Sequence, residues 1–142
     1  MVLLIKEIMR PDFLSVPPDR SALECVRAMV DRREGVVLVV EAGRTIGIAT
    51  EWDFVSKLLA QEKDPRTVTI AEIATRPVQS VGAQTPTVDV IDQMAKSGIR
   101  RMVVTEGDRT VGIVTSKDVF RAFRAYMERV SSDIAKLQSM SL

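Results

Sequence analysis

The residues of this chain best suited to ligand chemistry lie in a seven-residue pattern that occurs twice. Residues 47–53 read Gly-Ile-Ala-Thr-Glu-Trp-Asp, and residues 112–118 read Gly-Ile-Val-Thr-Ser-Lys-Asp. In both, an apolar stretch typical of a strand ends at a threonine, where a helical pattern begins. The aspartate can accept hydrogen bonds from two vicinal ribose hydroxyls, and the free N–H groups at a helix N-terminus suit a phosphate.

The same pattern has a purely structural explanation. Thr-x-x-Asp is a form of the capping box, in which both side chains satisfy backbone N–H groups at the start of a helix. A capped helix needs no ligand, so the spacing alone leaves both interpretations open. The glycine favours a site, because it lets another group approach the strand closely. Arg100 and Arg101 would form charge-assisted hydrogen bonds with a phosphate. Their counterparts in the first half, Gly35 and Val36, are uncharged, so we expect unequal binding by the two copies.

These patterns belong to a longer internal duplication. A shift of 65 residues aligns residues 5–59 with residues 70–124 without a gap, and fourteen of the aligned pairs are identical. Such a match indicates two copies of one unit. Each copy predicts the element order β-α-β-β-α, with a helix at about 21–33 in the first and a closing helix that begins at Thr50 or Thr115. The linker at 61–66 is short, so we expect an α+β fold with α/β-type layers, in which the copies pack as a pseudo-two-fold pair.

The final helix is predicted to outrun its counterpart, from residue 116 to about residue 140. Its apolar residues follow a heptad-like spacing of 3 and 4; they are Phe120, Phe123, Met127, Val130, Ile134 and Leu137. We therefore divide the chain into a first repeat (1–64), a second repeat (65–126) and a C-terminal helical extension (127–142). An apolar stripe of this size is typical of an interface. We expect a homodimer, with packing of the helix against its own repeats as the alternative.

The composition excludes several classes of function. The 142 residues include no histidine and one cysteine, which excludes histidine-based catalytic triads, an intramolecular disulfide and the usual zinc sites. Twenty basic and nineteen acidic residues nearly balance, so no overall field attracts nucleic acid or a membrane surface. No apolar run reaches the ~18 residues of a membrane span. We expect a cytoplasmic protein without nucleic-acid or membrane partners.

The order of these elements, written twice, resembles the CBS domain, and two in tandem resemble a Bateman module. The resemblance rests on the opening Ile-x-Glu-Ile, the Ser-Val pair before the first long helix, residues 98–104 (Gly-Ile-Arg-Arg-Met-Val-Val) and both Gly-x-x-Thr-x-x-Asp junctions. It covers residue 5 to about residue 126. It implies a stand-alone regulatory or sensor module that binds an adenine nucleotide between the repeats. AMP is favoured, and ADP or ATP would share the site; no catalytic residues, metal or cofactor are implied.

The resemblance also implies the residues that contact the nucleotide. Those implied to hold ribose or phosphate at the junctions are Thr50, Asp53, Thr115 and Asp118. Those implied to border or flank the base are Ser15, Val16, Ser80, Val81, Val36 and Ile99. Those implied to reach phosphates are Arg100, Arg101 and Lys117. Trp52 stands in the first copy where Lys117 stands in the second; its ring can stack on a base or serve packing.

Two further functions stay open at this point. In the first, the repeats are a structural scaffold without a ligand, both Thr-x-x-Asp sequences are caps, and the C-terminal helix mediates oligomerisation or interaction. In the second, the module senses S-adenosylmethionine, because this compound shares its adenosine with AMP, ADP and ATP. An enzyme is disfavoured, since Asp53 and Asp118 head separate repeats without a nucleophile or metal cluster. In the regulatory interpretation, a separate protein reads the bound state.

Overall fold

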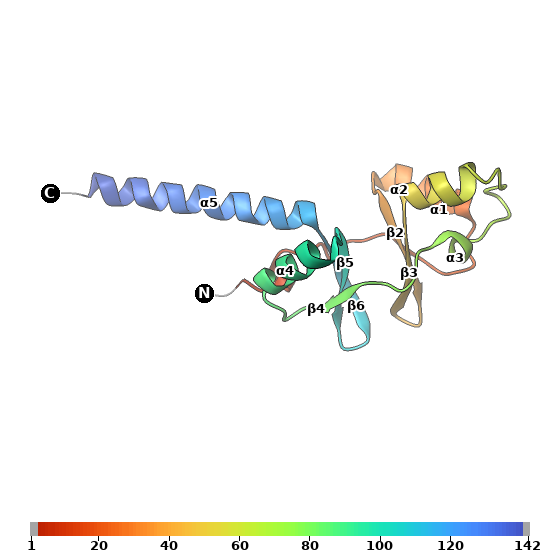
Figure 1. The fold of residues 1–142 in the computed structure, drawn as a ribbon, viewed down its shortest axis with the longest axis horizontal. Helices are drawn as coiled ribbons and strands as arrows, with labels where there is room; N and C mark the ends of the chain where they lie inside the picture. Colours follow the sequence, from red (N-terminus) through yellow and green to blue (C-terminus); the bar gives the residue numbers. More distant parts are fainter. Residues whose placement is uncertain (1–2, 141–142) are drawn as a thin grey trace.

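The computed structural model describes residues 3–140 and contains two three-stranded sheets that face each other, with the helices on their outer sides (Figure 1). A 3₁₀ turn (Ile5–Glu7) opens the chain. The first repeat contains β1 (Ser15–Val16), α1 (Ala22–Arg32), β2 (Val36–Glu41), β3 (Arg44–Thr50) and α2 (Glu51–Phe54), with a π-helical turn (Val55–Leu59) after it. The second repeat contains α3 (Ile70–Ile73), β4 (Ser80–Gly82), α4 (Thr87–Ser97), β5 (Arg101–Glu106), β6 (Arg109–Thr115) and α5 (Ser116–Ser139).

The two sheets have the same topology and register. In each, the short first strand is parallel to the middle strand, and the middle strand is antiparallel to the third. Leu38 pairs with Ile48 in one sheet, and their counterparts Val103 and Ile113 pair in the other. The predicted α+β fold, with two β-α-β-β-α copies and a long C-terminal helix, is confirmed.

Three apolar clusters hold the copies together. Each repeat packs its long helix on one face of its own sheet, through Cys25 and Met29 of α1 and through Val90 and Met94 of α4. This follows from the apolar face of each helix, which recurs at helical spacing. The third cluster lies between the sheets; its buried members are Val36, Leu38, Val103 and Ile113. Burial of this inter-sheet face fixes the relative position of the two repeats.

The opening segment of each copy crosses over to the other copy. Ile5 lies in the core of the second repeat, and Ile70 and Ile73 lie in the core of the first. The repeated glycine makes room for this crossing: a Cβ atom at Gly112 would lie 2.6 Å from Met9 Sδ, within overlap distance. At Gly112, the group that approaches the strand closely is therefore residues 9 and 10 of the chain and not a ligand.

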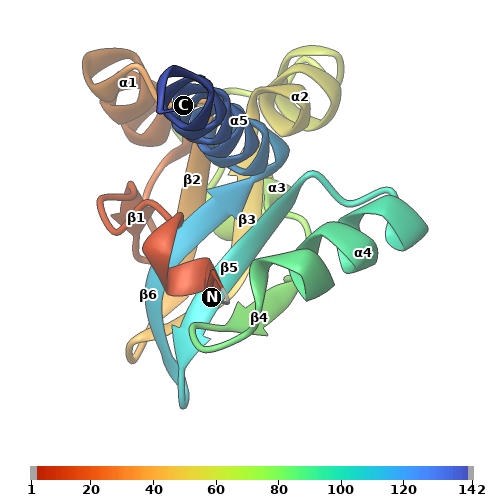
Figure 2. The same cartoon turned by 90° about the vertical axis from the view of Figure 1, so that its left-hand side faces the viewer.

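Helix α5 extends well beyond the two sheets (Figure 1). Figure 2 shows the N-terminus of α5 beside α1 and α2 at one end of the sheets, and the two hairpin ends at the opposite end. Along α5 the apolar stripe is largely exposed; the side chain of Leu137, for example, is 69% exposed. Within residues 3–140, none of the helices combines the length and apolarity needed to cross a membrane.

Candidate functional site

A cleft of about 650 Å³ lies between the repeats, at the end of the sheets where α5 begins. The first repeat contributes the segment between α1 and β2 and the start of α2. The second repeat contributes the start of β5 and the first turn of α5. The residues that line the cleft are Arg10, Arg33, Glu34, Gly35, Val36, Glu51, Arg100, Arg101, Thr115, Ser116, Lys117, Asp118 and Arg121.

The charge of this lining is predominantly positive. Six of its side chains are basic and three are acidic, although the whole chain carries a net charge of only +1. The dipole of α5 adds to the positive potential, because residues of its first turn line the cleft, although Ser116 N already donates to Arg100 O and Asp118 N to Thr115 Oγ1. The cleft therefore favours an anionic ligand.

Asp118 is the buried carboxylate of this cleft, with 6% of the residue exposed. Its Oδ2 accepts hydrogen bonds from Thr115 N at 2.8 Å and from Thr115 Oγ1 at 2.9 Å. Asp118 N in turn donates to Thr115 Oγ1 at 3.3 Å, so the capping box is real. Among residues 3–140, the ionic partner of Oδ1 is Arg121, whose Nη1 lies 3.5 Å away. Since a carboxylate offers about four acceptor positions, Asp118 caps α5 and still has an oxygen available to ligand hydroxyls.

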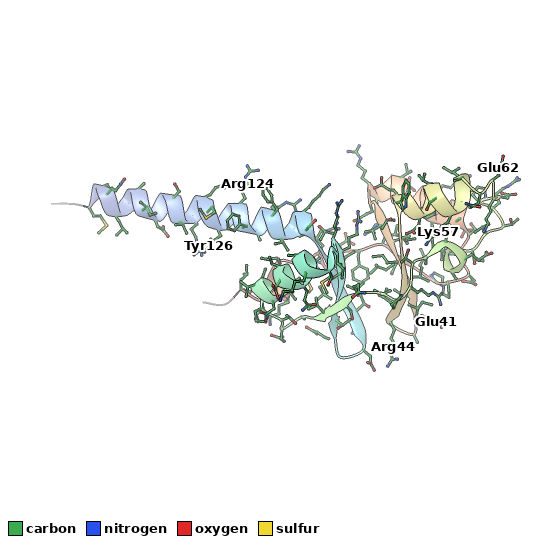
Figure 3. The ribbon with its side chains drawn as sticks, viewed as in Figure 1. Glu41, Arg44, Lys57, Glu62, Arg124 and Tyr126 are labelled. Carbon is green, nitrogen blue, oxygen red and sulfur yellow. The ribbon has the colours of Figure 1, made fainter. Side chains whose placement is uncertain are left out.

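The equivalent carboxylate of the first repeat, Asp53, is fully engaged. Its Oδ2 accepts from Thr50 N at 2.8 Å, as in the other copy. Its Oδ1 accepts from Thr75 Oγ1 at 3.0 Å and pairs with Lys57 Nζ at 2.9 Å. Lys57, labelled in Figure 3, also donates to Ile73 O at 3.2 Å, which ties α3 to the π-helical turn. The two junctions therefore share a cap, but only Asp118 lines the cleft.

The cleft brings together six of the residues that the resemblance implies: Val36, Arg100, Arg101, Thr115, Lys117 and Asp118. Ile99 lies in an adjoining hollow that Arg100 and Ser116 also line. The sequence interpretation missed Arg10, which arrives through the crossing segment. The position of Arg121 beside Asp118 could have been predicted, since Arg121 follows Asp118 at the i+3 spacing of helical ion pairs.

The other implied residues lie elsewhere. Val16 and Val81 point into the cores of their own repeats. Ser15 is exposed, and Ser80 lines a separate pocket near the hairpin ends. Thr50 and Asp53 form the α2 cap, and Trp52 is 71% exposed outside the cleft lining.

Comparison with known proteins identifies the family. The CBS domain model matches residues 5–60 and 70–125, so the chain belongs to the CBS domain family and contains a CBS pair. An uncharacterized protein of Methanopyrus kandleri, MK0525, is 30% identical over 136 residues, which cover 94% of this chain and 69% of that protein. The L-aspartate semialdehyde sulfurtransferase of Methanocaldococcus jannaschii is 34% identical over 124 residues, which span only 23% of that enzyme.

A solved structure of similar fold carries ligands. The CBS domain pair of protein MJ0100, in complex with 5′-methylthioadenosine and S-adenosyl-L-methionine, is 31% identical and has a TM-score of 0.77. The match covers 89% of this chain and 99% of that chain. The duplicated fold and these matches define a CBS-pair regulatory module.

Proposed function

We propose that this CBS pair is a sensor that binds an adenosyl ligand with a phosphate group, AMP foremost, in the cleft between its repeats. One observation carries the proposal. The acceptor Asp118 and the N-terminus of α5 share a single cleft with the basic side chains of Arg100, Arg101 and Lys117. A vicinal diol and an anionic group are the two features that such a lining recognises.

Each part of an adenine nucleotide has a matching group. The Oδ1 of Asp118, which makes only a long ion pair with Arg121 among residues 3–140, accepts hydrogen bonds from the ribose. Val36 lines the cleft and Ile99 lines the adjoining hollow, and their apolar side chains offer contacts to the base. The guanidinium groups of Arg100 and Arg101 bind phosphate oxygens through paired N–H donors. Binding changes the packing of the pair, and a separate regulated protein reads that change; no bond of the ligand is broken.

The charge of the cleft discriminates among adenosyl ligands. S-adenosylmethionine carries a sulfonium cation, and the six basic side chains of the lining repel it, whereas they attract a phosphate. The two adenosyl compounds in the related CBS pair support the adenosyl class. ADP and ATP keep the ribose and add charge, so the same groups accept them. We therefore favour AMP, with ADP and ATP as further ligands and S-adenosylmethionine as the alternative.

We further propose that two copies associate through α5. The observation behind this proposal is the apolar stripe on a helix that extends beyond the sheets (Figure 1). Phe120, Phe123 and Leu137 of this stripe are each more than half exposed. An isolated helix is marginally stable in water, and most helices are stabilised by packing of an apolar face. A second α5 supplies such a face with the matching heptad spacing.

The ligand proposal is tested by replacing Arg100 and Arg101 with glutamine. The double variant should lose affinity for AMP far more than for adenosine, because only AMP has the phosphate. Its AMP affinity should also depend less on salt concentration, since the lost contribution is electrostatic. Isothermal titration calorimetry at two ionic strengths measures both effects. Equal losses for AMP and adenosine would contradict the assignment of these arginines.

A further inference from the structure

Arg10 connects the two repeats at the cleft. Its backbone is hydrogen-bonded to the second repeat: Arg10 N donates to Ile113 O at 2.8 Å, and Ile113 N donates to Arg10 O at 3.0 Å. Its side chain contacts the first repeat: Arg10 Nη1 donates to Glu34 Oε2 at 3.3 Å. Glu34 directly follows Arg33, the C-cap of α1. The side chain of Arg10 thus ties the end of α1 to the strand that leads into α5.

The Arg10–Glu34 hydrogen bond leaves another donor of the Arg10 guanidinium without a hydrogen bond. Arg10 Nε is buried and has no hydrogen-bond partner among residues 3–140. Arg10 Nε forms an ion pair with Asp118 Oδ2 at 3.6 Å, beyond hydrogen-bond distance, and that oxygen already accepts from Thr115. A guanidinium presents five donors in a planar fork that matches a carboxylate or a phosphate with two parallel bonds. Glu34 accepts one such bond, so the fork of Arg10 keeps donors that a phosphate can use.

The pair has no counterpart in the other copy. By the 65-residue shift, Arg10 corresponds to Thr75 and Glu34 corresponds to Ile99. Thr75 uses its hydroxyl to satisfy Asp53, and Ile99 cannot form an ion pair. The Arg10–Glu34 pair is therefore not required by the repeated fold. It occurs only where the cleft lies.

We propose that the Arg10–Glu34 pair is a switch operated by the phosphate of the ligand; this inference rests on the proposed function. Glu34 is an acidic group in a lining rich in basic groups, and it competes with phosphate for the guanidinium of Arg10. A bound phosphate accepts two N–H bonds from Arg10, which frees Glu34 and releases the end of α1 from β6. The ligand shifts the packing of the repeats by this difference in contacts.

The two ends of the pair predict opposite effects on affinity. Glu34→Gln removes the competitor, so it should tighten AMP binding severalfold and leave adenosine binding unchanged. Arg10→Gln removes the phosphate partner, so it should weaken AMP binding by about tenfold and weaken adenosine binding much less. Arg32→Gln is the matched control, because Arg32 pairs with Asp12 at 2.8 Å on the surface and does not line the cleft. It should change neither affinity.

Calorimetric titration of the four proteins with AMP and with adenosine tests the switch, and a melting curve for each variant verifies its fold. A higher AMP affinity for Glu34→Gln alone already supports the switch, even where Arg10→Gln does not fold. Wild-type binding of AMP with an unchanged or reduced affinity in Glu34→Gln would overturn the switch and leave the proposed function standing. Absence of AMP and adenosine binding by the wild type would overturn both.

Discussion

Thr45 Oγ1 and Thr110 Oγ1 lie 2.7 Å apart, in a hydrogen bond between equivalent residues of the two repeats. Beside them, Arg44 at one hairpin end (Figure 3) pairs with Asp108 of the other hairpin. The hydrogen bond between the two threonines lies on the pseudo-two-fold axis, because Thr45 and Thr110 are related by the 65-residue shift. The repeats therefore keep an identical residue, Thr45 or Thr110, at this contact between them. They differ at the opposite end of the sheets, where Asp118 lines a cleft and Asp53 is held by Lys57.

The two junction aspartates give a matched pair of variants. Asp118→Ala should weaken AMP and adenosine binding alike, by about tenfold or more, because the ribose loses a charged acceptor worth roughly 1.5–3 kcal/mol. Asp53→Ala should leave both affinities unchanged. Both variants lose a cap worth about 1 kcal/mol, but Asp53→Ala should be the less stable one, since its ion pair with Lys57 at 2.9 Å is closer than the pair of Asp118 with Arg121 at 3.5 Å. Calorimetry and melting temperatures measure these effects. Unchanged ligand affinity in Asp118→Ala would mean that Asp118 is only a cap.

The crossing segment is tested by Gly112→Ala. The new Cβ atom would lie 2.6 Å from Met9 Sδ and 3.0 Å from Arg10 O, and the strain should lower the free energy of unfolding by about 1–3 kcal/mol. Gly82→Ala is the control, because its nearest contact is Thr85 Oγ1 at 3.7 Å. Denaturant unfolding compares the two. Equal stability of both variants would argue against the observed path of residues 9 and 10 over β6.

The single cysteine should be unreactive in the folded protein. Burial raises the pKa of the Cys25 thiol from 9.0 to about 11, so the reactive thiolate is scarce at pH 8. A thiol reagent should modify Cys25 only after unfolding. Rapid modification of the native protein would contradict the core position.

The same shift predicts a pH dependence of stability. The folded-state pKa of Cys25 lies above the unfolded-state value, so the contribution of the thiol is complete below pH 9. It is lost as the pH rises toward 11, because the unfolded chain then releases its proton more readily. Cys25→Ala should remove this part of the decline in the free energy of unfolding. An equally steep decline in the variant would assign the effect to other groups.

The dimer proposal predicts that charges in the α5 stripe separate the copies. Val130→Glu with Ile134→Glu should convert a dimer to a monomer, since both carboxylates would face an apolar partner. Ser132→Glu with Ser139→Glu adds the same charge outside the heptad positions and should leave the dimer intact. Light scattering measures the mass of each. A monomeric wild type at micromolar concentration would defeat the proposal, and a dimer that survives the first pair of changes would place the interface on other helices.

The duplication made the fold readable from the sequence, because each element was visible twice. Asp118, Arg100 and Arg101 were predicted together for the same reason: their positions follow from strand ends and a helix start. Arg10 was not found, since periodicity shows which face of a segment is buried but not which repeat covers it. The ion pair that occupies Asp53 could have been predicted from the sequence, because Lys57 follows Asp53 at the i+4 spacing of helical ion pairs.

The most direct test of the central claim is a calorimetric titration of the wild-type protein with AMP, adenosine, S-adenosylmethionine and GMP. The cleft geometry predicts that AMP binds more tightly than adenosine and S-adenosylmethionine. It also predicts one molecule per chain, because Asp118 lines the cleft between the repeats while Asp53 is occupied by Lys57 and Thr75. S-adenosylmethionine binding at least as tight as AMP binding would contradict the phosphate assignment. No binding of any of the four at millimolar concentration would contradict the sensor function and favour a scaffold.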